Sequence, residues 1–283
     1  MSASTRDAHI LGPNTIMTAQ GAALFYRDWG TGDPNLFLAG WTLASDMWAY
    51  QMEPLSRQGF RCIAFDRRSH GRSSDPGRGY DYETLADDLA DVIKALGLES
   101  VTLVGHSFAS GEVVRYLTRH GSDRIARVLL VAPAAIPFLL KADDNPTGIP
   151  GSAFEKARGA ILGDFAGWME ANTEPYFGPG TSPLMIDWTV RMMTQTSLLA
   201  AGELNRIQVT TDFRPELARL DVPVLIIHGD SDASAPLELT GRPAASLIPG
   251  ARLVVYEGGP HGLYFTHRER LNRDLVEFIR NGG

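Results

Sequence analysis

Ser107 stands where an apolar run meets a helical pattern. The segment Val101–Ala109 reads VTLVGHSFA, and helical spacing follows it. A strand, a tight Gly-x-Ser turn and a helix hold a serine in strained backbone geometry with its side chain pushed out, which is the context that a serine nucleophile needs. The same position also suits a serine that only caps the helix. The motif alone therefore leaves two interpretations, a nucleophile and a helix cap.

A serine nucleophile needs a base and an acid that orients the base, and both occur downstream. Asp230 and Asp232 follow the apolar run 224–227, and His261 follows the apolar run 253–256 in a glycine-rich loop. In open parallel sheets the active residues gather beyond the carboxyl ends of the strands. Ser107, one of the two aspartates and His261 are therefore expected to converge, which favours the nucleophile over the cap.

The other histidines fit catalysis or metal binding less well. His106 is next to Ser107 but is expected to point sideways at the turn, and His228 closes a buried strand. No two of the seven histidines have helical ligand spacing beside a carboxylate. The single cysteine, Cys62, supplies neither an internal disulfide nor a cysteine-rich zinc site. We expect no metal and no cofactor.

These residues need a mostly parallel sheet with helices on both faces. Strands that are apolar at every residue have both faces covered. After a hairpin near 15–26, strands are expected at 35–39, 61–65, 100–104, 126–131, 222–227 and 252–256, with helices at 45–57, 82–96, 108–119, 237–247 and 268–280. The predicted fold class is α/β.

The segment 134–212 interrupts this alternation. It is rich in proline, glycine and aromatic residues, has helical pieces near 153–162 and 183–201, and has no clear strand. We interpret it as a helical cap, or lid, inserted between two strands of the sheet. Residues 1–133 and 213–283 then form the core domain.

Composition excludes several partners. The 283 residues include 26 basic and 33 acidic side chains, a net charge of −7, and an acidic surface repels phosphate backbones. The longest apolar run, 128–140, contains two prolines and falls short of the ~20 residues that a membrane span needs. The first residues lack a signal-peptide core. We expect a cytoplasmic protein with a small-molecule substrate and neither nucleic acid nor membrane as partner; homo-oligomerisation is left open.

The chain resembles the α/β-hydrolases, and in particular the bacterial aryl esterase, perhydrolase and cofactor-free (non-haem chloroperoxidase-like) haloperoxidase family. The matching motifs span nearly the whole length and include Gly40-Trp41, Ala64–Arg68, Val101–Ser107, His228–Asp230 and Pro260–Gly262. This resemblance implies the α/β-hydrolase fold, with a mostly parallel sheet and an inserted cap.

The resemblance also assigns roles that the residues alone leave open. The family places its acid at the fourth position of Gly-x-x-Asp, which is Asp232 rather than Asp230. It places an oxyanion hole at two backbone N–H groups, one after the glycine that ends the third strand and one after the nucleophile. Those positions are Trp41 and Phe108.

Five positions depart from the family pattern. Ala39 replaces a histidine, Ser69, Ala109 and Ser110 replace glycines, and Thr42 stands where perhydrolase-like members tend to have proline. None of these changes removes a catalytic side chain. They bear on the family's usual substrates more than on its chemistry, and they make peracid formation a side activity.

Candidate pocket residues come from the cap and from the loops around the site. Small side chains at 233–235, behind the acid, predict a roomier and slightly more polar acyl pocket, and the cap aromatics predict an apolar or aromatic substrate. The candidates are Thr42, Phe138, Phe154, Trp188, Phe213, Ala235 and Leu263.

The function predicted from these residues is hydrolysis of a carboxylic ester or lactone through an acyl-enzyme. Ser107 would attack the carbonyl carbon, His261 would take the serine proton, and Asp232 would orient the imidazole. Two alternatives remain: a ligand receptor that retains the three residues, and a non-hydrolytic lyase or cyclase of small-molecule biosynthesis. Rapid release of phenol from activated aryl acetates would favour the esterase.

Overall fold

The computed structural model describes residues 7–282, and nine strands in this range form one sheet. Their order is β1-β2-β3-β5-β4-β6-β7-β8-β9. Pairing is antiparallel from β1 to β5 and parallel from β5 to β9. The strands are β1 (His9–Gly12), β2 (Thr15–Met17), β3 (Ala23–Trp29), β4 (Pro34–Leu38), β5 (Arg61–Phe65), β6 (Val101–His106), β7 (Ile125–Val131), β8 (Val224–Gly229) and β9 (Arg252–Tyr256).

Apolar residues on both faces of the strands explain why the sheet is covered twice. In β4, Leu36 and Leu38 belong to the apolar cluster on one face, and Phe37 belongs to the cluster on the other. β8 repeats this alternation with Ile226 and Ile227. Successive side chains of a strand point to opposite faces, so a continuous apolar run needs helices on both sides.

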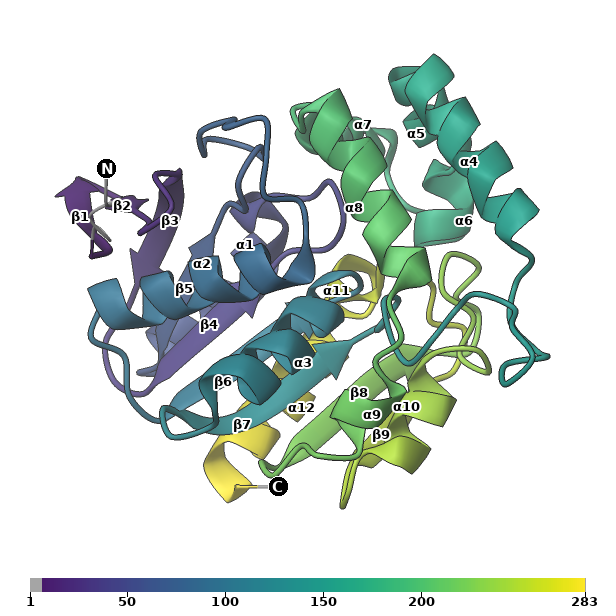
Figure 1. Cartoon of the computed structure of the whole chain (residues 1–283). Coiled ribbons are helices and arrows are strands. Elements are labelled where there is room, and N and C mark those ends of the chain that lie inside the picture. The colour runs from purple at the N-terminus through teal and green to yellow at the C-terminus, as the bar shows by residue number, and fades with distance from the viewer. Residues whose placement is uncertain (1–6, 283) are drawn as a thin grey trace.

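Two layers of helices meet this need (Figure 1). One face packs against α2 (Tyr82–Ala95), α3 (Ala109–His120), α9 (Arg214–Leu217) and α10 (Gly241–Leu247). The other face packs against the short turn η1 (Ser45–Trp48) and the helices α1 (Ala49–Arg57), α11 (Leu263–Thr266) and α12 (Arg268–Asn281). The mostly parallel α/β fold predicted from the sequence is thereby confirmed; residues 1–6 and 283 of the predicted core lie outside the described residues.

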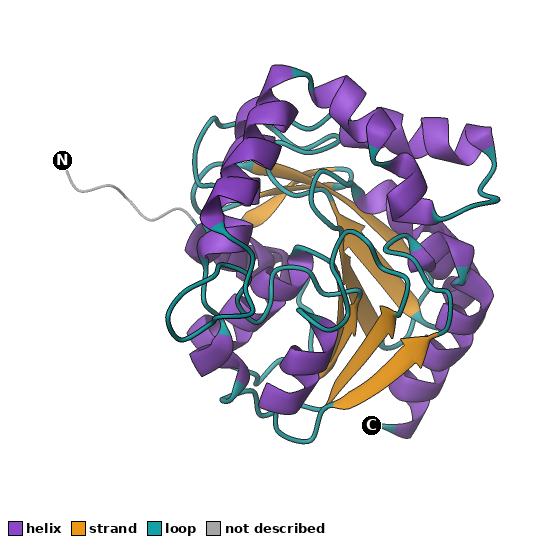
Figure 2. Cartoon of the chain, turned by 90° about the vertical axis from the view of Figure 1, so that its right-hand side faces the viewer, coloured by secondary structure: helices purple, strands orange, loops and turns teal. Residues whose placement is uncertain are grey.

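Five of the six described helices between β7 and β8 lie over the carboxyl ends of the strands (Figures 1 and 2). We call residues 151–210 the helical insertion. It comprises α4 (Gly151–Gly163), α5 (Phe165–Ala171), α6 (Thr173–Phe177), α7 (Pro183–Met193) and α8 (Leu198–Thr210). The pattern near 183–201 predicted helix but missed the break between α7 and α8 and the continuation to Thr210.

Hydrogen bonds from the insertion reach three loops of the sheet edge. Thr196 Oγ1 donates to the Thr42 carbonyl at 3.0 Å, and Ser197 N donates to the Ser69 carbonyl at 3.0 Å. The Tyr176 carbonyl accepts from Gly262 N at 2.7 Å. The insertion is therefore bound to the loops after β4, β5 and β9.

The strand order changes direction at β4. The chain leaves β4 for β5 on one side, whereas β6 pairs on the other side. Ligands of open α/β sheets bind at such a switch point, in the crevice beyond the carboxyl ends of the strands. None of the described helices is long and apolar enough to span a membrane.

Candidate active site

Ser107 lies at the sharp turn between β6 and α3. Its φ of 56° is in the left-handed region, which is strained for a residue with a Cβ. Ser107 N donates to the Val131 carbonyl at 2.9 Å, and this bond holds the turn against β7. The Ser107 Oγ lies 2.8 Å from His261 Nε2. The strained turn therefore presents the hydroxyl to an imidazole rather than to the helix.

His261 and Asp232 extend this contact into a chain of hydrogen bonds. His261 Nδ1 donates to Asp232 Oδ2 at 2.7 Å, which leaves Nε2 free to accept from Ser107. The other oxygen, Asp232 Oδ1, accepts from the amides of Ser234 at 2.9 Å and Ala235 at 2.7 Å. Burial disfavours charge on Asp232, but the nearby His261 and His228 outweigh it and hold the pKa of this carboxyl below its usual range.

The two candidate aspartates have different surroundings. Asp230 is exposed, and its Oδ1 accepts from Gly258 N at 2.7 Å, so this carboxylate joins the loop after β8 to the loop after β9. Asp230 and His261 form no hydrogen bond with each other. The structure brings Asp232, not Asp230, together with His261 and Ser107.

Two further histidines surround this chain. His106 Nε2 lies 3.1 Å from the His261 carbonyl, and burial lowers the pKa of His106 to about 3, so its ring is neutral at physiological pH. His228 Nε2 donates to the Ala235 carbonyl at 2.9 Å and lies 3.2 Å from Asp232 Oδ2. Sequence reasoning missed the contact of His228 with the carboxylate, because a histidine that ends a strand gives no sign of its neighbours.

Two backbone N–H groups are available beside Ser107. The amides of Trp41 and Phe108 donate to no acceptor within residues 7–282. The loop that carries Trp41 packs tightly, because a Cβ at Gly40 would lie 2.6 Å from His106 Nδ1. The next residue, Thr42, has a φ of 62°. Free N–H groups at a helix N-terminus and in a tight loop suit a developing negative charge.

Arg67 contacts both of the segments that carry these N–H groups. Its guanidinium donates to the carbonyls of Ala39 at 2.7 Å and Gly40 at 3.3 Å, and it lies 4.9 Å from the centre of the Phe108 ring. The buried carboxylate of Glu112 pairs with it. This ion pair joins the loop after β5 to α3.

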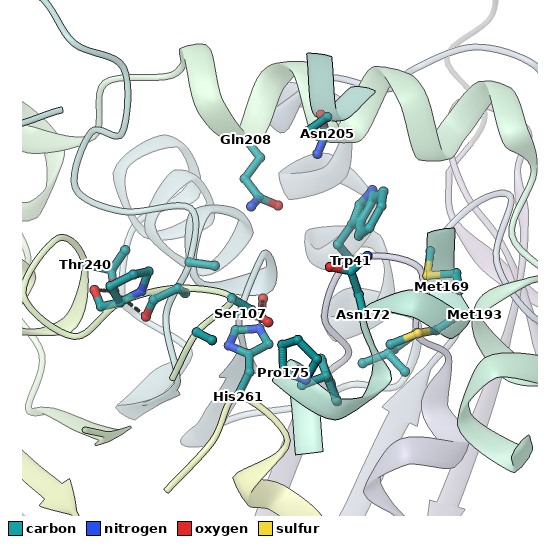
Figure 3. Close-up of a pocket in the computed structure, with 18 of the residues that line it drawn as sticks. Trp41, Ser107, Met169, Asn172, Pro175, Met193, Asn205, Gln208, Thr240 and His261 are labelled. Carbon is teal, nitrogen blue, oxygen red and sulfur yellow. Dashed lines mark hydrogen bonds between the residues drawn. The ribbon is translucent and has the colours of Figure 1, made fainter. Parts of the chain in front are cut away.

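A cavity of about 310 Å³ lies above Ser107 and His261, between the sheet edge and the helical insertion (Figure 3). Two of the predicted pocket residues, Phe154 and Ala235, line it, together with Ala233 and Ser234. The remaining wall is mostly apolar and includes Trp41, Leu43, Leu139, Trp168, Met169, Tyr176, Phe177, Met193 and Leu239.

Five predicted pocket residues lie elsewhere, and this is a correction. Phe213 is fully buried under α3, with its ring 4.9 Å from that of Tyr82, and Leu263 is buried in the core around α12. Thr42 is buried between two residues that line the cavity, Trp41 and Leu43. Phe138 lines a separate surface pocket, and Trp188 packs against the core. An apolar side chain fits a core as well as a pocket, so residue type alone did not distinguish the two.

The chain is similar to known proteins over most of its length. Residues 36–268 match the family described as alpha/beta hydrolase fold. A non-heme chloroperoxidase from Kitasatospora aureofaciens is 37% identical over 269 residues, which is 93% of this chain and 98% of that protein. A bifunctional esterase/perhydrolase from Acinetobacter calcoaceticus is 36% identical over 94% of this chain and 99% of its own length.

Solved structures show the same likeness in three dimensions. A bromoperoxidase from Bacillus anthracis superimposes with a TM-score of 0.88 at 34% identity, over 92% of this chain and 96% of that one. An esterase from Exiguobacterium antarcticum gives a TM-score of 0.90 at 29% identity, over 94% and 99%. The chain belongs to the alpha/beta hydrolase family. Its relatives in this family include proteins named as haloperoxidases and proteins named as esterases.

Proposed function

We propose that this protein is a serine hydrolase that cleaves carboxylic esters or lactones of small substrates. The observation that carries the proposal is the continuous chain of hydrogen bonds from Ser107 through His261 to Asp232, with two unpaired N–H groups beside the hydroxyl. The esterase names of several relatives support the same chemistry.

In the first step, Ser107 Oγ bonds to the carbonyl carbon of the substrate while its proton passes to His261 Nε2. The carbonyl oxygen becomes an oxyanion, and the amides of Trp41 and Phe108 donate to it; one such donor is worth about 2.7–4 kcal/mol of barrier. The imidazolium is stabilised by the Asp232 carboxylate. The proton then moves from His261 to the leaving alcohol oxygen as the C–O bond breaks.

The second step returns the enzyme to its resting state. Water enters the cavity and loses a proton to His261 Nε2 while its oxygen bonds to the acyl carbon. The second oxyanion collapses, the bond to Ser107 Oγ breaks, and the serine regains its proton from His261. The helical insertion acts as a cap that keeps the acyl group in an apolar space.

Hydrolysis of p-nitrophenyl acetate and butyrate tests this proposal. Release of p-nitrophenol is expected with the parent protein, and Ser107→Ala should lower kcat by about 10⁶-fold, because loss of the nucleophile removes the acyl-enzyme route. Ser110→Ala, at the second position of α3, is the matched control. Equal turnover by parent and Ser107→Ala would overturn the proposal.

Perhydrolysis is a second candidate, because one relative is named an esterase/perhydrolase. Hydrogen peroxide would replace water in the second step, so its oxygen would bond to the acyl carbon and release a peracid. Thr42, where perhydrolase-like sequences tend to have proline, makes this a side reaction. Adding peroxide to the ester assay should leave the carboxylic acid as the main product, with peracid in a minor yield.

A further inference from the structure

Helix α8 presents two carboxamide side chains to the roof of the cavity. Asn205 and Gln208 are three residues apart, so they share one face of the helix, and both line the cavity. In Figure 3 both point from α8 toward the space above Ser107 and His261. The position opposite the nucleophile is where the part of a substrate remote from the scissile carbonyl would lie.

These two carboxamides are not used to hold the fold together. Asn205 Oδ1 is buried without a hydrogen-bond partner in the described part of the chain, and the Gln208 carboxamide points into the cavity. Four other polar side chains on the cavity wall instead donate to backbone carbonyls of their own segments: Asn172, Thr173, Thr189 and Thr240. A buried polar group without a partner is destabilising, so an unpaired amide here points to a ligand that completes it.

The cavity wall also indicates the charge of that ligand. Among the described residues that line it there is no Lys, Arg, Asp or Glu. His106 lines it as a neutral ring, since burial lowers the pKa of this imidazole to about 3. Moving an unpaired charge from water into such a space is strongly unfavourable.

We infer that the substrate is an uncharged ester or lactone that carries a hydrogen-bonding group, an amide or a hydroxyl, which Asn205 and Gln208 bind. A carboxamide both donates and accepts, so the pair is complementary to a group that does the same. The inference rests on the proposed function, and it replaces a purely apolar substrate with one that is apolar around the scissile bond and polar toward α8. A substrate without the polar group leaves the amides unpaired and is discriminated against.

Matched esters test this inference on the parent enzyme. The polar member is p-nitrophenyl γ-acetamidobutyrate, and its partner has a methylene in place of the amide N–H and a methyl branch in place of the amide oxygen. A second pair carries the same change on the alcohol side, as the N-acetylethanolamine ester of butyric acid and its hydrocarbon analogue. We expect the polar member of one pair to have a kcat/KM higher by about tenfold. The mono-p-nitrophenyl ester of succinic acid, which is anionic, should react more slowly with the enzyme than either p-nitrophenyl ester of the first pair.

Variants of α8 then assign the preference to its residues. Gln208→Met and, separately, Asn205→Leu remove the hydrogen-bonding atoms at similar volume, and each should reduce the polar-to-apolar ratio to below about threefold. Gln195→Met makes the same replacement at an exposed position between α7 and α8 and should keep the full ratio. If one α8 variant does not fold, the other variant and the parent ratios still decide.

The outcomes separate this inference from the proposed function. Hydrolysis of p-nitrophenyl acetate that depends on Ser107, with equal rates in both matched pairs, would overturn the inference and leave the esterase proposal intact. A preference that survives in Gln208→Met and Asn205→Leu would also overturn it. Absence of any hydrolysis that depends on Ser107 would overturn the proposed function itself.

Discussion

Asp230 and Asp232 are two residues apart and have the same chemistry, yet the fold gives them different partners. Asp232 Oδ2 accepts a hydrogen bond from His261 Nδ1 at 2.7 Å, whereas Asp230 Oδ1 accepts one from the backbone amide of Gly258. The sequence pattern alone left both as candidates, because a loop after a strand does not reveal which side chain turns inward. The resemblance to the family selected Asp232, and the hydrogen bonds of the structure support that selection.

Substitution of these two carboxylates is the sharpest comparison at the scale of single residues. Asp232→Asn should lower kcat for ester hydrolysis by about 10⁴-fold, because an amide favours the wrong tautomer of His261. Asp230→Asn is the matched control and should keep kcat within a few fold. Steady-state kinetics on p-nitrophenyl acetate measures both, and a larger loss in Asp230→Asn than in Asp232→Asn would refute the assignment.

The elements show where prediction from the sequence succeeded and where it failed. Strands with a continuous apolar run, such as β6 and β8, were predicted within two residues of their observed bounds, since few other structures accommodate such runs. The short helices α5 and α6 were missed because glycine, proline and aromatic residues obscure the helical period. Asn205 and Gln208 could have been noticed as a polar pair at helical spacing, but the helix bounds that reveal this spacing were not predicted.

The hydrogen bond of Thr196 gives a prediction about how the helical insertion is attached to the sheet edge. Thr196 Oγ1 donates to the Thr42 carbonyl and joins the α7–α8 turn to the loop that carries Trp41. Thr196→Val keeps the shape but leaves a buried carbonyl unpaired, so the free energy of unfolding should fall by about 1–3 kcal/mol. Urea denaturation measures this change.

The matched control for this prediction is Thr194→Val. Thr194 directly follows α7, and its Oγ1 donates to the Val190 carbonyl of that helix, at a partly exposed position. Its loss should change the free energy of unfolding by less than about 0.5 kcal/mol. Similar effects of the two substitutions would contradict the view that the Thr196 contact anchors the insertion.

For the whole molecule, buried neutral histidines should make the fold sensitive to acid. Burial lowers the pKa of His70 from an ordinary value of 6.5 to about 3. Between these values the unfolded chain binds one proton more than the folded chain, so the free energy of unfolding falls as the pH falls below 6.5, by about 1.4 kcal/mol per pH unit. Asp88 acts in the opposite direction, since burial raises its pKa to about 6.

Replacing His70 isolates its contribution from that of Asp88. His70 Nδ1 donates to the Arg68 carbonyl at 2.9 Å, and asparagine retains a donor near this position but does not titrate. From pH 7 to pH 5, His70→Asn should lose about 2 kcal/mol less of its free energy of unfolding than the parent protein. Urea denaturation at both pH values measures the difference, and identical pH dependence would show that His70 does not bind a proton on unfolding.

The fold class and the residues of the candidate site were predictable from two patterns. The alternation of strands with helices, and the order serine, aspartate, histidine after successive strands, can both be read along the sequence. The residues that shape the cavity were not predictable, since core and pocket use the same apolar side chains, as Phe213 and Phe154 illustrate. The predicted cytoplasmic location depends on surroundings outside one chain and stays a prediction, and homo-oligomerisation stays open.

The central claim is that the Ser107 hydroxyl is made nucleophilic by His261 and Asp232. Incubation with a fluorophosphonate, followed by peptide mass mapping, tests it directly, because this reagent bonds to an activated serine oxygen. We expect one phosphonyl group per chain on Ser107, loss of ester hydrolysis in step with labelling, and greatly slowed labelling in His261→Ala. Labelling at another residue, or continued hydrolysis by fully labelled protein, would contradict it.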